Sequence, residues 1–243
     1  MRRLVVLVLM LGLFVGVSAA VASGVTWIGN QVSAWFNPGA QKPAYDADTA
    51  SSLTVVVNKA RPLNPLTYHP RKIGSVELAK PAADAYLKMK AAIHKAGAGE
   101  LKIDSGFRDF ATQQDTYLHY TAALGMNAGE NRAAKPGYSE HQTGLAADIS
   151  ATDQTCAIKI CFAQTKAGKW LVHNSWKFGF ILRYPKGATA VTGYQFEPWH
   201  YRFVGKKLAA EMNAAKATVL ETYLGLPPAP DYVMASGSPT ASN

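Results

Sequence analysis

The strongest constraint on this chain is the stretch at residues 139–148, which reads Ser-Glu-His-Gln-Thr-Gly-Leu-Ala-Ala-Asp. It places His141 and Asp148 seven positions apart, with Gly144 between them. An imidazole and a carboxylate are both ligands that a divalent metal such as zinc accepts. The pair alone is a weak signal, because a histidine beside a glycine is more often a loop or capping residue. A metal site would need a third ligand, so the fold would have to bring a distant part of the chain to this stretch.

The best candidate for the third ligand is His200, the last residue of the sequence Glu-Pro-Trp-His. In a regular strand, residues three apart point to opposite faces, so Glu197 and His200 would not share a site. Pro198 often marks a bulge or a strand end, and a break there would let both side chains reach one place. The alternative is an edge strand with Glu197 in solvent and His200 stacked on Trp199.

These residue types form a chemically complete set for hydrolysis. Two neutral imidazoles, His141 and His200, and the Asp148 carboxylate would fill three positions on zinc and leave the fourth for water. The metal would lower the pKa of that water to about 7. A carboxylate that is not a ligand would then take the proton, and Glu197 is the candidate.

Other hydrolytic mechanisms find no support in the sequence. There is no His-Glu-x-x-His pair of the kind that holds zinc on a helix. There is no Ser-x-x-Lys, and the sequence Val-Thr-Gly at 191–193 lacks the lysine of Lys-Thr-Gly, so the serine penicillin-binding pattern is missing.

The formal net charge of +9 favours polyanionic partners. No cluster of lysine and arginine is interleaved with aromatic residues, so we predict no nucleic-acid partner. An anionic cell envelope fits this charge.

The start of the chain has the layout of a secretory signal peptide over residues 1–22. Arg2 and Arg3 precede an apolar run at 4–17, and Ala-Val-Ala at 20–22 forms a small-residue cleavage site. The alternative is an uncleaved membrane anchor through residues 4–22, which are nearly long enough to span a bilayer. Both alternatives place the rest of the chain outside the cytoplasm, in a bacterial cell envelope.

Cys156 and Cys161 are the two cysteines of the chain. An even count in an exported protein predicts a disulfide between them. The alternative is a metal pair, but zinc cysteines are usually closer in sequence and come with a second pair, which is absent.

The hydrophobic pattern divides the chain into a linker at 23–50, a folded domain at 51–226 and a disordered tail at 227–243. Within the domain we expect strands at 53–57, 101–105, 145–149, 180–184 and 194–204. We expect helices at 80–96, 109–124, 169–177, 206–215 and 218–224, and a loop at 125–137. The first helix would carry an apolar stripe of Ala82, Tyr86, Met89 and Ile93. Asp109 would cap the second helix, which has a mostly apolar side of Phe110, Gln113, Tyr117, Tyr120 and Leu124. Helices flanking short strands indicate an α+β fold with an antiparallel sheet.

Taken together, these motifs resemble the VanY-type zinc D-alanyl-D-alanine carboxypeptidases. The matching stretches are Ser-Gly-Phe-Arg at 105–108 with Gln113, then 136–148, Trp-Leu at 170–171, 179–185 and 197–205. The resemblance covers about residues 53–226, and several separate motifs in the right order make it specific.

The resemblance implies a hedgehog-like α+β fold with one zinc ion per chain, held by His141, Asp148 and His200. It also implies that Glu197 is the catalytic base and that Arg108 stabilises the developing charge. From spacing alone, Arg108 would rather be assigned to a surface salt bridge.

By the same resemblance, Gln113 and Ser139 hold the terminal D-alanine region of the substrate. The family removes the last D-alanine from peptidoglycan stem peptides that end in D-Ala-D-Ala. We therefore expect an exported, monomeric zinc D,D-carboxypeptidase. The alternatives are a peptidoglycan endopeptidase on the same scaffold and a zinc-containing wall-binding module without turnover.

Overall fold

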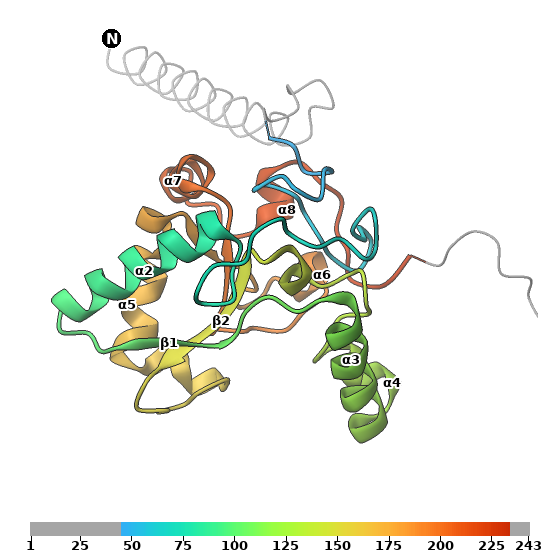
Figure 1. Ribbon diagram of the computed structural model, residues 1–243, viewed down its shortest axis with the longest axis horizontal. Helices are drawn as coiled ribbons and strands as arrows, with labels where there is room; N and C mark the ends of the chain where they lie inside the picture. Colours follow the sequence, from blue (N-terminus) through green and yellow to red (C-terminus); the bar gives the residue numbers. More distant parts are fainter. Residues whose placement is uncertain (1–44, 234–243) are drawn as a thin grey trace, which may run out of the picture. The chain divides into compact units, whose positions relative to one another are not determined.

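The computed structural model describes residues 45–233 (Figure 1). The predicted signal peptide or anchor and most of the predicted linker and tail lie outside this range. Within residues 45–233, no helix combines the length and the hydropathy that crossing a membrane requires.

A four-stranded antiparallel sheet forms the centre of the domain and confirms the predicted α+β class. Its spatial order is β1 (Leu101–Ser105), β2 (Ala146–Ala151), β4 (His200–Phe203) and β3 (Phe180–Leu182). All neighbouring strands pair antiparallel. The two central strands are therefore β2 and β4, which carry two of the predicted metal ligands.

The register of β2 and β4 gives the sheet two chemically different faces. Ala147 lies opposite Tyr201, and both side chains are fully buried in the main hydrophobic core. Asp148 lies opposite His200. Because successive residues of a strand point to opposite faces, this second pair lies on the side away from that core.

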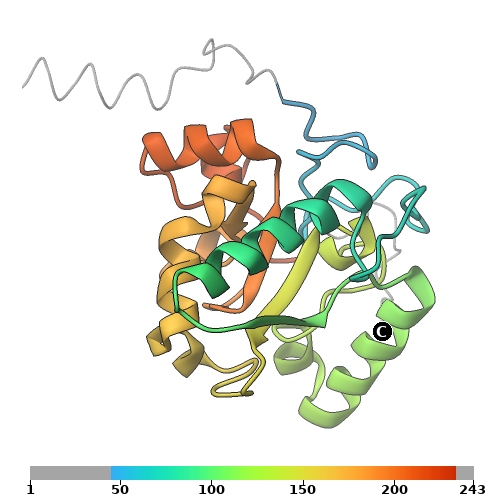
Figure 2. The ribbon, with the colours of Figure 1, turned by 60° about the vertical axis from the view of Figure 1, so that its left-hand side comes forward.

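Helix α2 (Lys80–Lys95) covers the core and crosses the sheet in Figure 2. The predicted apolar stripe of this helix is buried throughout and consists of Ala82, Tyr86, Met89 and Ile93. The helix ends before Gly97, which adopts a left-handed backbone with φ 63°. This helix is the clearest success of the sequence pattern.

Three further helices complete the domain. Helix α5 (Lys166–Asn174) packs in the same core as α2, whereas α7 (Lys206–Ala214) and α8 (Leu220–Tyr223) pack in a second hydrophobic core. Helix α5 starts earlier than predicted because Thr165 caps it, with its hydroxyl oxygen accepting from the Gly168 amide at 3.0 Å. The segment that continues to residue 178 is a separate 3-10 helix, η3 (Ser175–Phe178).

The predicted strand at 53–57 is wrong. Val55, Val56 and Val57 are buried, but their backbone pairs with no strand among residues 45–233. The Leu53 and Val55 carbonyl oxygens instead accept hydrogen bonds from the Arg202 side chain, at 3.2 and 2.6 Å. The β-branched run therefore reflected burial and not pairing in a sheet.

Three other assignments were inaccurate. The strand predicted at 194–204 is ordered as a strand only from His200, after a turn at Pro198 and Trp199. The predicted loop at 125–137 contains the short helix α4 (Met126–Glu130), and α6 (Thr189–Thr192) was not predicted.

Residues beyond both ends of the predicted domain also pack on it. Ala47 is buried, and the Tyr45 hydroxyl donates to Glu211 at 2.6 Å, so residues 45–50 pack on the domain. Beyond residue 226, Ala229 is buried, and the Lys135 amide donates to the Tyr232 hydroxyl oxygen at 2.8 Å. The folded unit therefore includes all of residues 45–233.

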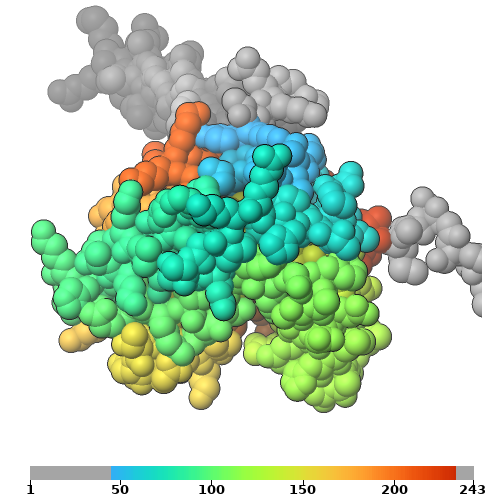
Figure 3. All heavy atoms as spheres, viewed as in Figure 1, coloured from blue at the N-terminus to red at the C-terminus, as the bar shows by residue number. Residues whose placement is uncertain are grey.

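Helix α3 (Phe110–Leu124) stands out from the sheet beside α4 (Figure 1). Asp109 caps it as predicted, accepting from the Thr112 amide at 2.8 Å. Gln113 is its one buried side chain, so the predicted apolar side of this helix does not face a core. In Figure 3 this hairpin forms a lobe, separated by a notch from the yellow residues that follow β2.

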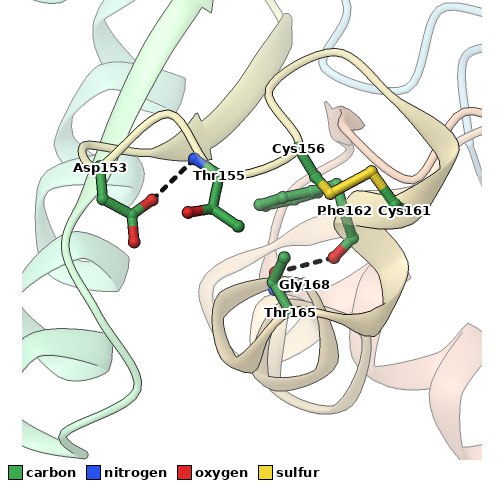
Figure 4. Close-up of a disulfide and its surroundings, with 7 residues drawn as sticks. All are labelled: Asp153, Thr155, Cys156, Cys161, Phe162, Thr165 and Gly168. Carbon is green, nitrogen blue, oxygen red and sulfur yellow. Dashed lines mark hydrogen bonds between the residues drawn. A yellow bond between two sulfur atoms is a disulfide. The ribbon is translucent and has the colours of Figure 1, made fainter.

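The predicted disulfide between Cys156 and Cys161 is confirmed, with the two Cα atoms 5.5 Å apart (Figure 4). It closes a loop that leads into the 3-10 helix η2 (Ile160–Gln164). The fully buried Phe162 lies beside it and anchors the loop on the core.

We expect removal of this disulfide to lower the free energy of unfolding by about 2 kcal/mol, because the loop it closes in the unfolded chain is short. The measurement is urea unfolding of the Cys156→Ser, Cys161→Ser double variant against the oxidised protein. The control is the same double variant with reductant, which should not change further. Equal unfolding midpoints for the oxidised protein and the double variant would contradict the expectation.

Candidate metal centre

Three side chains predicted as metal ligands converge in the structure. One ligand atom each of His141, Asp148 and His200 lies within 4.8 Å of the others. His141 Nε2 is 3.5 Å from Asp148 Oδ2, and His200 Nδ1 is 3.3 Å from Asp148 Oδ1. Both imidazoles are almost fully buried, so the three donors form an enclosed cluster.

The local sequence explains how these residues meet. Asp148 and His200 are direct partners across β2 and β4. His141 lies in the 3-10 helix η1 (Glu140–Thr143), which joins β2 through Gly144 at φ 67°. A Cβ atom at Gly144 would lie 2.9 Å from the Ala79 amide nitrogen, so both space and backbone conformation require glycine there.

Each imidazole has one ring nitrogen engaged behind the cluster and the other directed into it. His141 Nδ1 lies 2.7 Å from the Gly106 carbonyl oxygen, so this nitrogen carries the proton and Nε2 faces Asp148. His200 Nε2 lies 3.4 Å from Glu140 Oε2, and its Nδ1 faces Asp148. This is the arrangement in which histidines ligate metals.

The electrostatics of the cluster favour a cation. Burial alone would raise the pKa of Asp148, but the neighbouring His141 and His200 hold it well below its usual range. Burial alone would lower the pKa of His200, but Asp148 and Glu140 raise it to about 9. Asp148 Oδ1 is buried and has no hydrogen bond within residues 45–233. These charges favour a cation between the three side chains, and a zinc ion bound there would take the place of the His200 proton.

Glu197 lies beside the cluster without being part of it. The turn at Pro198 and Trp199 ends with the His200 amide donating to the Glu197 carbonyl oxygen at 3.2 Å. This turn is the predicted strand break, and it brings Glu197 Oε2 to 3.5 Å from His200 Nδ1. Burial raises the pKa of Glu197 to about 7, which suits a group that accepts and returns a proton near neutral pH.

A cleft opens onto the cluster, and Arg108 and Ser139 are both in its wall. Burial lowers the pKa of the Arg108 guanidinium, while Asp148 and Glu197 oppose that change. Arg108 Nε is buried without an acceptor among the described residues. The surface salt bridge that spacing alone favoured for Arg108 is therefore not what the structure shows.

Gln113 lies behind the cleft wall and not in it. It is fully buried, and its Nε2 donates to the Ala134 carbonyl oxygen at 2.8 Å. Ala134 lines the cleft, so Gln113 supports the wall from behind. The structure does not bring Gln113 to the position expected for a substrate contact.

Glu140 is the site residue that the sequence reasoning missed. Its carboxylate is fully buried, and burial would raise its pKa, but Arg183 and Arg202 hold that pKa well below its usual range. The available signal was its place next to His141, but nothing in the local sequence shows that a glutamate there is buried.

Comparison with known proteins gives a consistent result. The family model described as VanY, D-alanyl-D-alanine carboxypeptidase, matches residues 75–206. YodJ of Bacillus subtilis (strain 168), a provisionally assigned carboxypeptidase, is 41% identical over 152 residues, which are 63% of this chain and 55% of YodJ. The chain spans about half the length of the curated relatives it matches.

Two solved structures show the same fold. The LdcB LD-carboxypeptidase superposes with a TM-score of 0.66 at 36% identity, covering 73% of this chain and 88% of LdcB. A mutant of the vancomycin-resistance D,D-pentapeptidase VanY in complex with Zn(II) gives a TM-score of 0.59 at 32% identity, covering 71% of this chain and 98% of that one. These likenesses confirm the predicted zinc-peptidase fold class.

Proposed function

Since this chain belongs to the VanY family of D-alanyl-D-alanine carboxypeptidases, we propose that it is a zinc-dependent carboxypeptidase that releases the terminal D-alanine of peptidoglycan stem peptides. The observation that carries this proposal is the convergence of His141, Asp148 and His200, with Glu197 beside them and a cleft leading in. The named relatives are all called peptidases, which favours an enzyme over a non-catalytic wall-binding module.

His141, Asp148 and His200 would hold the ion through His141 Nε2, His200 Nδ1 and one Asp148 oxygen. A zinc ion held there supplies Lewis-acid polarisation of the scissile carbonyl and lowers the pKa of the attacking water.

The remaining steps belong to side chains of the cleft. Glu197 takes the proton of the attacking water and returns it to the leaving amino group of D-alanine, as a buried carboxylate of raised pKa can do. Arg108, whose Nε has no acceptor in the part of the chain that the structure describes, stabilises the negative charge that develops on the substrate. Ser139 contributes a hydroxyl in the cleft wall for the substrate.

A second candidate differs in the bond that is cleaved. The LdcB structure, named as an LD-carboxypeptidase, superposes with a higher TM-score than the VanY structure, 0.66 against 0.59. An L,D-carboxypeptidase would remove D-alanine from a peptide in which the preceding residue has the L configuration. Both candidates use the same metal and the same Glu197.

The site of action proposed is the bacterial cell envelope, where the substrate is found. The disulfide between Cys156 and Cys161 supports this location, because such bonds persist in oxidising compartments. The net charge of +9 suits an anionic wall.

The test is the release of D-alanine by the purified full chain from three peptides. One ends in D-Ala-D-Ala, one ends in L-Lys-D-Ala, and one has its terminal D-Ala-D-Ala blocked as the amide. We expect release from the first, its loss with a chelator and its return with added zinc. Faster release from the second would establish the L,D candidate, and cleavage of the blocked peptide would indicate an endopeptidase. No D-alanine from either free peptide would refute the proposal.

A further inference from the structure

A buried network of four charged side chains lies directly behind His200. Its members are Glu140, Arg183, Arg202 and Glu221, and all four side chains are essentially inaccessible to solvent. Glu140 Oε1 accepts from Arg183 Nε at 2.7 Å and from Arg202 Nη1 at 2.8 Å. The two arginines therefore fix the position of this one carboxylate oxygen.

The far ends of the network are tied to other parts of the fold. Arg183 donates twice to Glu221, at 2.9 and 2.5 Å, and the Asn58 amide adds a bond to Glu221 at 3.0 Å. Arg202 donates to the Val55 carbonyl oxygen at 2.6 Å. Two positive and two negative charges balance, so no charge of the network is buried without a partner, and its hydrogen bonds hold the Glu140 carboxylate in place.

The second carboxylate oxygen of Glu140 is left for His200. Oε2 lies 3.4 Å from His200 Nε2, on the side of the imidazole that faces away from Asp148. A fixed carboxylate oxygen there accepts a hydrogen bond from Nε2–H. This keeps the proton on Nε2 and leaves the Nδ1 lone pair facing the metal position.

From this geometry we propose that Glu140 is a positioning residue for the metal centre, which sets the tautomer and orientation of His200. The inference rests on the proposed function, because it assigns His200 to the metal. The same short helix, η1, thus supplies one ligand, His141, and the support of another. A purely structural ion pair would have no such effect on His200.

The Glu140→Gln variant tests the inference sharply. Its amide oxygen would be drawn to the two arginines, which can only donate, so its NH2 group would face His200 Nε2. That contact favours the opposite tautomer, with the proton on Nδ1. We expect zinc affinity to fall 10- to 100-fold, as measured by competition with a chromophoric chelator. We also expect the proton of His200 to move to Nδ1 in histidine ¹H–¹⁵N spectra of the metal-free protein, recorded above the His200 pKa of about 9 so that the imidazole is neutral.

The matched control is Glu221→Gln. It replaces the other carboxylate of the network, which also accepts from Arg183. Unlike Glu140, Glu221 has no hydrogen bond or ion pair with His200 among the described residues. We expect zinc affinity within a few-fold of the parent and an unchanged His200 tautomer. If Glu140→Gln does not fold, Glu140→Asp serves in its place, because it keeps the charge but is too short to hold both arginines and His200.

The inference is overturned if the Glu140 and Glu221 variants bind zinc equally well, or if the His200 tautomer is the same in both. Failure of the proposed function would look different. In that case the parent protein itself would not bind zinc, or would bind zinc without releasing D-alanine.

Discussion

Replacement of Glu197 by glutamine should slow D-alanine release by about 10²- to 10⁴-fold, the range that a positioned general base contributes. The amide has nearly the same size but cannot take a proton from water. The side chain is 13% exposed and is not one of the three converging ligands, so zinc should still bind. The measurements are the kcat for a peptide ending in D-Ala-D-Ala and the zinc content of the purified variant.

The control for this experiment is Glu100→Gln, which removes a carboxylate that pairs with His94 and does not line the cleft. It should leave both quantities unchanged. Near-normal turnover in Glu197→Gln would remove Glu197 as the base, whereas loss of zinc would show that it is a ligand.

The His200→Ala variant should lose zinc and activity together. Residues that only hydrogen-bond to a metal ligand already contribute about 10- to 100-fold in metal affinity. Loss of the ligand itself should therefore lower zinc affinity by more than about 100-fold. The variant also leaves Asp148 and Glu140 without the group that lies between them. Zinc affinity by chelator competition and D-alanine release at saturating zinc are the two measurements.

A matched variant is His173→Ala, which removes an exposed histidine in the last turn of α5. It should bind zinc as the parent does. Circular dichroism of the His200 variant must show a folded protein for the comparison to hold. Full zinc occupancy in a folded His200→Ala protein would contradict the ligand set.

The sequence was sufficient to predict that these three side chains converge, because chemistry and local pattern agreed. A metal site explains why two histidines and an aspartate occur together with a turn glycine and a Glu-Pro break. These residues are His141, Asp148 and His200. The apolar stripe on α2 could also be predicted, because a helix that buries one face must repeat its apolar residues about every 3.6 positions.

The failures share a physical cause, which is that the local sequence does not show which distant residue will be the partner of a buried group. Val55 was assigned to a strand because β-branched residues are common in strands. Its carbonyl oxygen instead accepts a hydrogen bond from Arg202, 147 positions away. Glu140 was passed over because a glutamate is ordinarily exposed. Its partners Arg183 and Arg202 come from residues more than 40 positions later.

The pairing of Asp148 with His200 across β2 and β4 has one more consequence. A slip of one residue between these strands would turn the Asp148 carboxylate toward the hydrophobic core. It would also leave the His200 imidazole without its partner. A cation that needs both groups can bind only to correctly aligned chains, and its affinity adds to their stability alone. The ion would therefore stabilise the correct alignment of the two central strands during folding, before the protein binds any substrate.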